Sequence, residues 1–245
     1  MQPYVFKKQI ITITFIVLGC MINWINNEKL LASVFLFYCI HIVGLSVIPY
    51  LRKNYKYPMI IHYTLYHLPM LIPALFIRNQ VIVKENMLTF VIGIVIGVLL
   101  ILSNYKHNQV YVSENNPIIN SALDTSTLII ELYHNIYVVV CEEVFFRLYI
   151  IGTLFHKLGI HAVLVSSILF LLSHFNNRWA NKIYNVRSYT YHFITGLCFG
   201  LIYYNSGSIL TCILAHLIFN SPEFLILLKR YKKFKESETI MFNDY

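Results

Sequence analysis

Charged residues are scarce in this chain. They make up only 12% of its 245 residues, whereas hydrophobic residues make up 58%. Because soluble domains carry about 25% charged residues, the composition excludes an ordinary soluble fold. The uncharged residues fall in long blocks whose lengths suit the hydrocarbon core of a bilayer. The sequence therefore predicts an all-α, polytopic membrane protein.

Several familiar patterns are also missing. The five cysteines form no C-x-x-C pair, which argues against a disulfide framework or a zinc ribbon. No H-E-x-x-H helix is present, so a zinc site would have to be assembled from separate helices. No internal repeat supports an inverted-repeat transporter. The net charge of +8 lies at the edges of apolar blocks, which favours a lipid bilayer over nucleic acid as its partner.

We predict about eight transmembrane helices in a single transmembrane domain over residues 1–245. The expected spans are residues 9–25, 30–50, 58–77, 87–103, 137–156, 158–175, 190–204 and 208–228. Between the fourth and fifth spans we expect a loop over 104–120 and an interfacial or capping helix over 121–135. The tail from Lys229 is expected to be disordered.

The sequence also predicts the orientation of the protein in the membrane, its cellular location and the packing of its helices. Lys and Arg concentrate on the side that carries both termini, so both termini should be cytoplasmic. The abundance of Ile, Asn, Lys and Tyr favours a low-GC bacterium and its cell membrane. Pro69 and Pro73 predict a kink in the third span. Gly93 and Gly97 have the G-x-x-x-G spacing of close helix contacts, here favouring packing within the chain over dimerisation.

The fifth span contains two adjacent carboxylates and an arginine in an apolar run. Ionisable groups in a membrane are costly and persist mainly where they pair or act. Glu143 and Arg147 are four residues apart, the spacing of an intrahelical ion pair. Glu142 lies about 100° further round the helix, so it is left over as a proton acceptor. The alternative is a purely structural cluster of charges between helices.

Three polar residues follow in later spans. His174 ends its span, where a histidine is commonly an interfacial residue. His216 and Asn220 are four residues apart and share a helix face. They could hydrogen-bond an oxyanion, the histidine could bind a metal, or the pair could make an interhelical contact.

The depth of these residues depends on where the fifth span begins. A start near Tyr137 brings Glu142, His174 and the His216–Asn220 face together in the cytoplasmic half of the bilayer. A start at Ser126 would place Glu142 at the opposite end from His174, so we prefer the first placement. We expect the remaining membrane histidines to make interhelical hydrogen bonds, these being His41, His62, His67 and His192.

These residues resemble the motifs of the CPBP family, the intramembrane proteases that include CAAX prenyl endopeptidases and bacteriocin-processing or immunity proteins. The family pattern is E-E-x-x-x-R, F-x-x-x-H and H-x-x-x-N in that order. All three motifs are intact within a core of residues 135–225: Glu142-Glu143-(three residues)-Arg147, Phe170-(three)-His174 and His216-(three)-Asn220.

The resemblance implies a membrane endopeptidase that cleaves a peptide or a membrane-anchored protein near the cytoplasmic face. It implies that Glu142 and His174 activate water and that His216 and Asn220 hold the oxyanion. Glu143 and Arg147 would support the site. Members are commonly called metalloproteases, so a divalent metal such as zinc remains open as a cofactor. The alternatives are a non-catalytic immunity or peptide-binding protein and a proton-coupled transporter; oligomeric state is left open.

Overall fold

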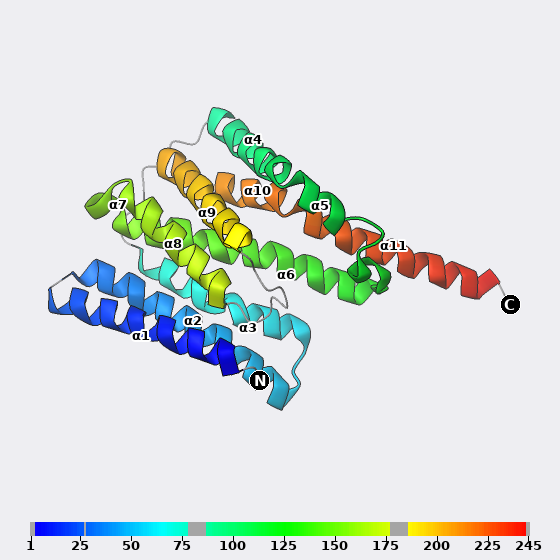
Figure 1. The fold of residues 1–245 in the computed structure, drawn as a ribbon, viewed down its shortest axis with the longest axis horizontal. Coiled ribbons are helices and arrows are strands. Elements are labelled where there is room, and N and C mark those ends of the chain that lie inside the picture. The colour runs from blue at the N-terminus through cyan, green and yellow to red at the C-terminus, as the bar shows by residue number, and fades with distance from the viewer. Residues whose placement is uncertain (1–2, 27, 78–86, 177–185, 244–245) are drawn as a thin grey trace.

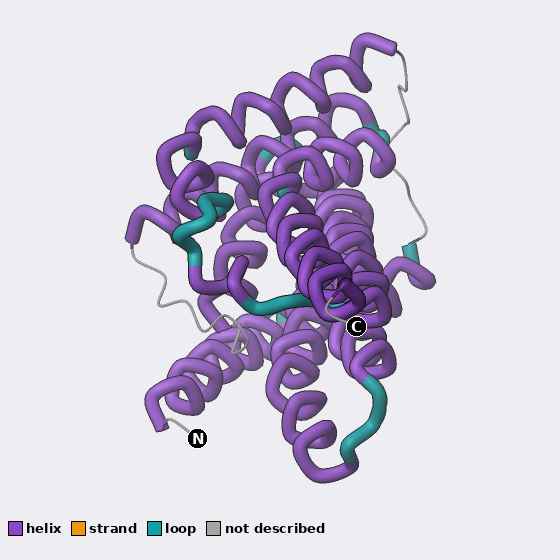
Figure 2. The backbone as a smooth tube through the Cα atoms, turned by 90° about the vertical axis from the view of Figure 1, so that its right-hand side faces the viewer, coloured by secondary structure: helices purple, strands orange, loops and turns teal. Residues whose placement is uncertain are grey.

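The computed structural model describes residues 3–26, 28–77, 87–176 and 186–243 (Figure 1). Every regular element in these ranges is a helix, which confirms the all-α prediction, and the connections are short (Figure 2). The α-helices are α1 (Pro3–Ile25), α2 (Lys29–Tyr55), α3 (Met59–Leu71), α4 (Met87–Ser103), α5 (Tyr105–Tyr111), α6 (Thr125–Glu143), α7 (Gly152–Leu158), α8 (His161–Asn176), α9 (Val186–Ser206), α10 (Ile209–Phe219) and α11 (Ser221–Asn243). Two 3-10 segments, η1 (Ile72–Phe76) and η2 (Pro117–Asn120), and one π-helix, η3 (Val144–Ile151), complete them.

The helices form two groups around a central one. Helices α1, α2 and α3 pack side by side, and α4, α9 and α10 form the opposite group in Figure 1. Between them, α6, η3 and α7 follow one another as a single helical path, and α8 runs back against it. The buried core cluster includes residues from both groups and from the central path. This arrangement brings residues from both halves of the chain to the middle of α6–η3.

The central helix begins earlier than expected. Asp124 caps α6, because its carboxylate accepts a hydrogen bond from the Thr127 N–H at 2.9 Å. Hydrogen bonds from Ser126 and Thr127 hold the pKa of the Asp124 carboxyl well below its usual value. The prediction of a separate helix over 121–135 and a span starting near Tyr137 is therefore wrong. The first turns of α6 also have a buried packing partner, because Leu128 clusters with Leu227 of α11.

Three other boundaries differ from the predictions. Residues 104–120, expected as a loop, contain α5 and η2. The last span is bent by 51° between α10 and α11, where Asn220 ends α10. The tail expected to be disordered continues as α11 to Asn243, since Lys229 Nζ donates to the Val112 carbonyl at 2.7 Å and Lys233 Nζ to Asn120 at 2.9 Å. In the third span, α3 passes into the 3-10 segment that contains Pro73, and the predicted kink stays a prediction.

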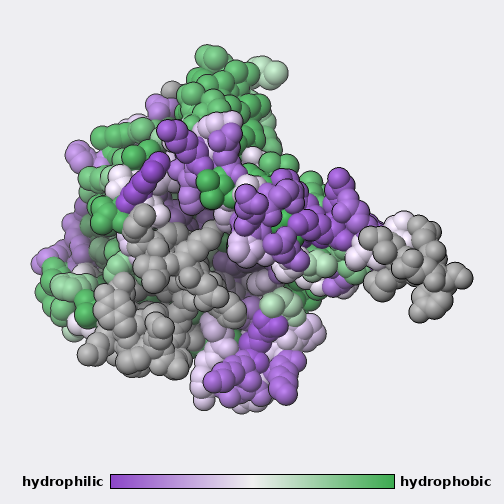
Figure 3. Space-filling model, turned by 45° about the vertical axis from the view of Figure 1, so that its right-hand side comes forward, coloured by the Kyte–Doolittle hydropathy of each residue, from purple (hydrophilic) through white to green (hydrophobic). Residues whose placement is uncertain are grey.

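Membrane-spanning helices can be counted by length and apolar character. Among the described residues, Lys29–Tyr55 and Met59–Phe76 are each long and apolar enough to cross a membrane, and the bent pairs α4–α5 and α10–α11 raise the number to four. Shorter apolar helices cover Ile11–Ile25 and His161–Phe175. The polytopic character is thus confirmed, whereas the number eight has only loose support. Figure 3 shows hydrophobic surface over the upper part of the view. Helix α4 exposes apolar side chains, among them Leu88, Val95 and Leu99.

The G-x-x-x-G pair packs within the chain, as predicted. A Cβ atom at Gly97 would lie 2.7 Å from the Ala215 carbonyl oxygen, and one at Gly93 would lie 2.6 Å from Thr211 Cγ2. Both glycines therefore let α4 approach α10, the helix that carries His216.

We expect Gly97→Ala to destabilise the protein by about 1–3 kcal/mol, because the added methyl group overpacks the α4–α10 contact. Gly19→Ala is the matched control, since a Cβ there would meet Phe35 at an ordinary 3.7 Å. Thermal unfolding of the detergent-purified variants measures the difference. Equal melting temperatures for the two variants would contradict this packing.

Candidate active site

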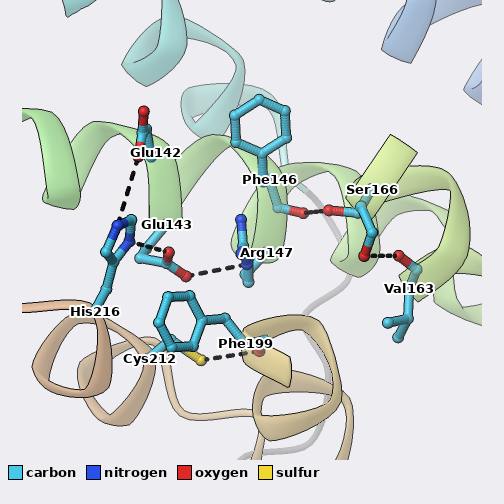
Figure 4. Close-up of polar contacts among 10 residues, drawn as sticks. Glu142, Glu143, Phe146, Arg147, Val163, Ser166, Phe199, Cys212 and His216 are labelled. Carbon is cyan, nitrogen blue, oxygen red and sulfur yellow. Dashed lines mark hydrogen bonds and ion pairs between the residues drawn. The ribbon is translucent and has the colours of Figure 1, made fainter. Parts of the chain in front are cut away.

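A π-helical segment lies directly after the two glutamates. Residues Val144–Ile151 form η3, the wider helical geometry that is frequently found at functional sites. The carbonyl oxygen of Phe146 in this segment accepts a hydrogen bond from Ser166 Oγ of α8 at 2.6 Å (Figure 4). This contact ties α8 to the π-helix, so the position of His174 on α8 is coupled to that of the glutamates.

The predicted ion pair between Glu143 and Arg147 is present. Arg147 Nε lies 3.1 Å from Glu143 Oε2, and both side chains are fully buried. The guanidinium nitrogens have no hydrogen-bond partner among the described residues, and the aromatic rings of Phe170 and Phe199 lie 4.9 and 5.7 Å from the guanidinium carbon. The ion pair with Glu143 and the cation–π contacts with the two rings therefore stabilise this buried cation.

Glu143 has a second partner, which the sequence did not indicate. His216 Nδ1 lies 2.7 Å from Glu143 Oε1 (Figure 4). A carboxylate can only accept here, so the imidazole donates from Nδ1. The other ring nitrogen, Nε2, then faces Glu142 Oε2 at 3.9 Å. One buried carboxylate thus fixes both the arginine and the orientation of the histidine.

Glu142 and His174 line the same cavity, as the sequence predicted. The centre of a water molecule can occupy about 20 Å³ of this cavity, which is enough for one water molecule. It is lined by side chains of α2, α3, α6 and α8: His41, Leu45, Tyr66, His67, Met70, Glu142, Ser173 and His174. His174 Nδ1 donates to the Phe170 carbonyl at 3.0 Å, so Nε2 of a neutral His174 is a proton acceptor.

The expected convergence of four residues is reproduced for three of them. Glu142 and His174 share the cavity, and His216 reaches Glu142. Asn220 lies one turn from His216, at the bend between α10 and α11, and its backbone N–H donates to the His216 carbonyl at 2.9 Å. Asn220 is not among the residues that line the cavity. Its predicted role at an oxyanion stays a prediction.

Glu142 and His174 meet although α6 starts at Thr125, the placement expected to separate them. The turn at Gly159 explains this, because α8 runs back beside the central helix and both residues are sixteen positions from Leu158. Their distance from the turn, rather than the start of the helix, sets their relative depth.

The remaining histidines follow the prediction only in part. His62 contacts the Tyr57 hydroxyl, and His67 Nε2 lies 3.4 Å from His134 Nε2, which is an interhelical contact. His192 stacks on His174 with ring centroids 4.1 Å apart. For His41 the prediction is wrong, because neither ring nitrogen has a hydrogen-bond partner in the described part of the chain.

The side chains do not form a ready zinc site. Within residues 3–26, 28–77, 87–176 and 186–243, no group of three or more His, Cys, Asp or Glu side chains is arranged to hold a metal ion. Protein zinc sites need three or four such ligands. The described donors therefore do not fit the divalent metal that the resemblance left open.

The fold and the site together define an integral membrane protein with a buried carboxylate–histidine centre. Residues 124–222 match the model of a known family, described as "type II CAAX prenyl endopeptidase Rce1-like". This match confirms the resemblance to the CPBP family, and the family is one of membrane proteases. Comparisons with curated proteins and with solved structures find no match for this chain. The matched segment contains all three motifs and excludes α1 to α5.

We expect Arg147→Met to destabilise the protein by about 3–5 kcal/mol, because it leaves the Glu143 carboxylate buried without its cation. The double variant Glu143→Gln/Arg147→Met should recover part of that loss, since no uncompensated charge remains. Thermal unfolding of both variants measures the coupling.

Lys157→Met is the matched control, because Lys157 pairs with Glu28 where both side chains are more than a third exposed. That substitution should cost at most about 1 kcal/mol. Strictly additive effects in the double variant would show that the buried pair is not coupled.

Proposed function

We propose that this protein is an intramembrane endopeptidase in which Glu142 activates water. The observation that carries the proposal is the shared cavity: Glu142 and a proton-accepting His174 line a space that fits one water molecule. The family match supports protease chemistry, since all three motifs fall inside it. The substrate class we propose is a membrane-associated peptide or membrane-anchored protein, such as a peptide leader or bacteriocin precursor, cleaved near the cytoplasmic face.

The first step is attack by water. Glu142 takes a proton from the water as its oxygen bonds to the scissile carbonyl carbon, and His174 accepts a hydrogen bond from the same water. Because Glu143 occupies Nδ1 of His216, this histidine can donate to the developing oxyanion only from a protonated Nε2. Asn220 is the second proposed donor to the oxyanion.

Collapse of the tetrahedral intermediate completes the reaction. The carbon–nitrogen bond breaks, and the proton held by Glu142 passes to the leaving amine, which balances the hydrolysis. The buried Glu143–Arg147 pair takes no proton in this scheme. Its proposed role is to hold His216 and the central helix in place, and the dry surroundings strengthen each of these contacts.

We expect Glu142→Gln to abolish cleavage while the folded protein stays in the membrane, because an amide cannot take the proton from water. Mass spectrometry of peptides from membranes that hold the wild-type or the variant protein identifies products whose formation depends on Glu142. Glu131→Gln is the matched control; Glu131 is a carboxylate of the same helix that accepts a hydrogen bond from Tyr63 at 2.9 Å and is absent from the cavity lining. Identical peptide sets from wild type and Glu142→Gln would refute the proposed activity.

We expect cleavage to survive removal of metal, since the proposed steps use only Glu142, His174, His216 and Asn220. The purified protein would be treated with a strong chelator, assayed on the identified substrate and analysed for bound zinc. Loss of activity that one equivalent of zinc restores would contradict the metal-free scheme.

A further inference from the structure

His41 is a buried polar residue whose ring nitrogens have no hydrogen-bond partner among the described residues. Only 2% of its surface is exposed, and neither Nδ1 nor Nε2 makes a hydrogen bond within the described structure. Unpaired polar atoms in the interior are rare and destabilising, so they call for an explanation such as a bound water or a catalytic role. His41 belongs to α2, outside the segment that matches the protease family.

The position of His41 is fixed from one turn away. The Tyr38 hydroxyl donates to the Leu169 carbonyl of α8 at 2.9 Å and accepts from Ser173 Oγ at 3.2 Å. Tyr38 is fully buried, so these bonds lock the register of α2 against α8. Three residues further along α2, His41 lies against the Phe145 ring, with centroids 5.8 Å apart, and lines the cavity beside His174.

A water molecule in the cavity needs one further hydrogen-bond donor. A water molecule there would give its two protons to Glu142 and to Nε2 of His174, both of which accept. One oxygen lone pair must remain free to attack the carbonyl carbon. The other lone pair needs an N–H or O–H donor, and a neutral imidazole carries one N–H. Ser173 already donates to Tyr38, and His67 already contacts His134 through Nε2. Among the described residues that line the cavity, His41 is the histidine on which both ring nitrogens lack a partner.

We propose that His41 is an additional catalytic residue, which binds the hydrolytic water by donating an N–H to its oxygen. The inference rests on the proposed function and adds to it a group from the N-terminal helices. His41 fixes the direction of the attacking lone pair, while Glu142 takes the proton. The N-terminal helices thereby complete the site as well as enclose it.

The test compares two substitutions of similar size. His41→Leu removes the donor, and His41→Gln retains an N–H. The probe is the peptide substrate identified through its dependence on Glu142. We expect His41→Leu to lower kcat by at least about tenfold with little change in KM, since the lost contact acts on the water rather than on the peptide. His41→Gln should retain a larger share of the wild-type kcat.

His62→Leu is the matched control, because His62 is equally buried, at 1% exposed, on α3 but lies outside the cavity lining. A wild-type kcat in His41→Leu would overturn the proposal. Equal losses in His41→Leu and His41→Gln, or a loss in His62→Leu as large as in His41→Leu, would overturn it too, since these outcomes indicate packing alone.

A second measurement does not depend on activity. A high-resolution experimental structure of the wild-type protein should show a water within hydrogen-bond distance of a His41 ring nitrogen, Glu142 and His174. An empty cavity, or a metal ion in place of the water, would overturn the assignment of His41. If no Glu142-dependent product exists, the proposed protease function fails, and this structure still decides whether His41 binds water.

Discussion

The buried contact between Glu143 and Arg147 is the constraint on which the rest of the site depends. A carboxylate and a guanidinium at zero exposure are tolerable only together, and here the carboxylate also receives the Nδ1–H of His216. One residue thus joins the central helix to α10. Because Glu143 is adjacent to Glu142, the contact that orients His216 also fixes the distance between its Nε2 and Glu142. The two fully buried charges therefore set the geometry of the site.

The second constraint is the helical path that presents Glu142. Thr125–Glu143 leads into a π-helix without a break, and α8 returns beside it after Gly159. This antiparallel pair sets Glu142 and His174 at the same depth. The first three helices then cover one side, and α2 is held in register by the Tyr38 hydroxyl. The cavity is consequently shared between a segment that matches a protease family and helices that do not.

The sequence predicted what depends on local spacing. The Glu143–Arg147 pair and the use of Gly93 and Gly97 follow from positions on one helix or at one contact. The shared cavity of Glu142 and His174 was also predicted, although from a wrong helix start. The Glu143–His216 bond, the π-helix and the unpaired His41 could not be predicted, because each depends on packing between segments far apart in the chain. The start at Thr125 could have been predicted, because Asp124 is a recognisable cap. The start near Tyr137 was favoured instead because it brings Glu142 to the depth of His174 on helices of equal length.

The central claim is that Glu142 activates water and does not attack the peptide itself. A single turnover in water enriched in ¹⁸O tests it most directly, with mass spectrometry of the product and of the protein fragment that contains Glu142. The account predicts one ¹⁸O atom in the new carboxyl group of the product and none in Glu142, since the oxygen bonds only to the substrate. Incorporation of ¹⁸O into the Glu142 carboxylate would show a covalent acyl intermediate and would contradict the account.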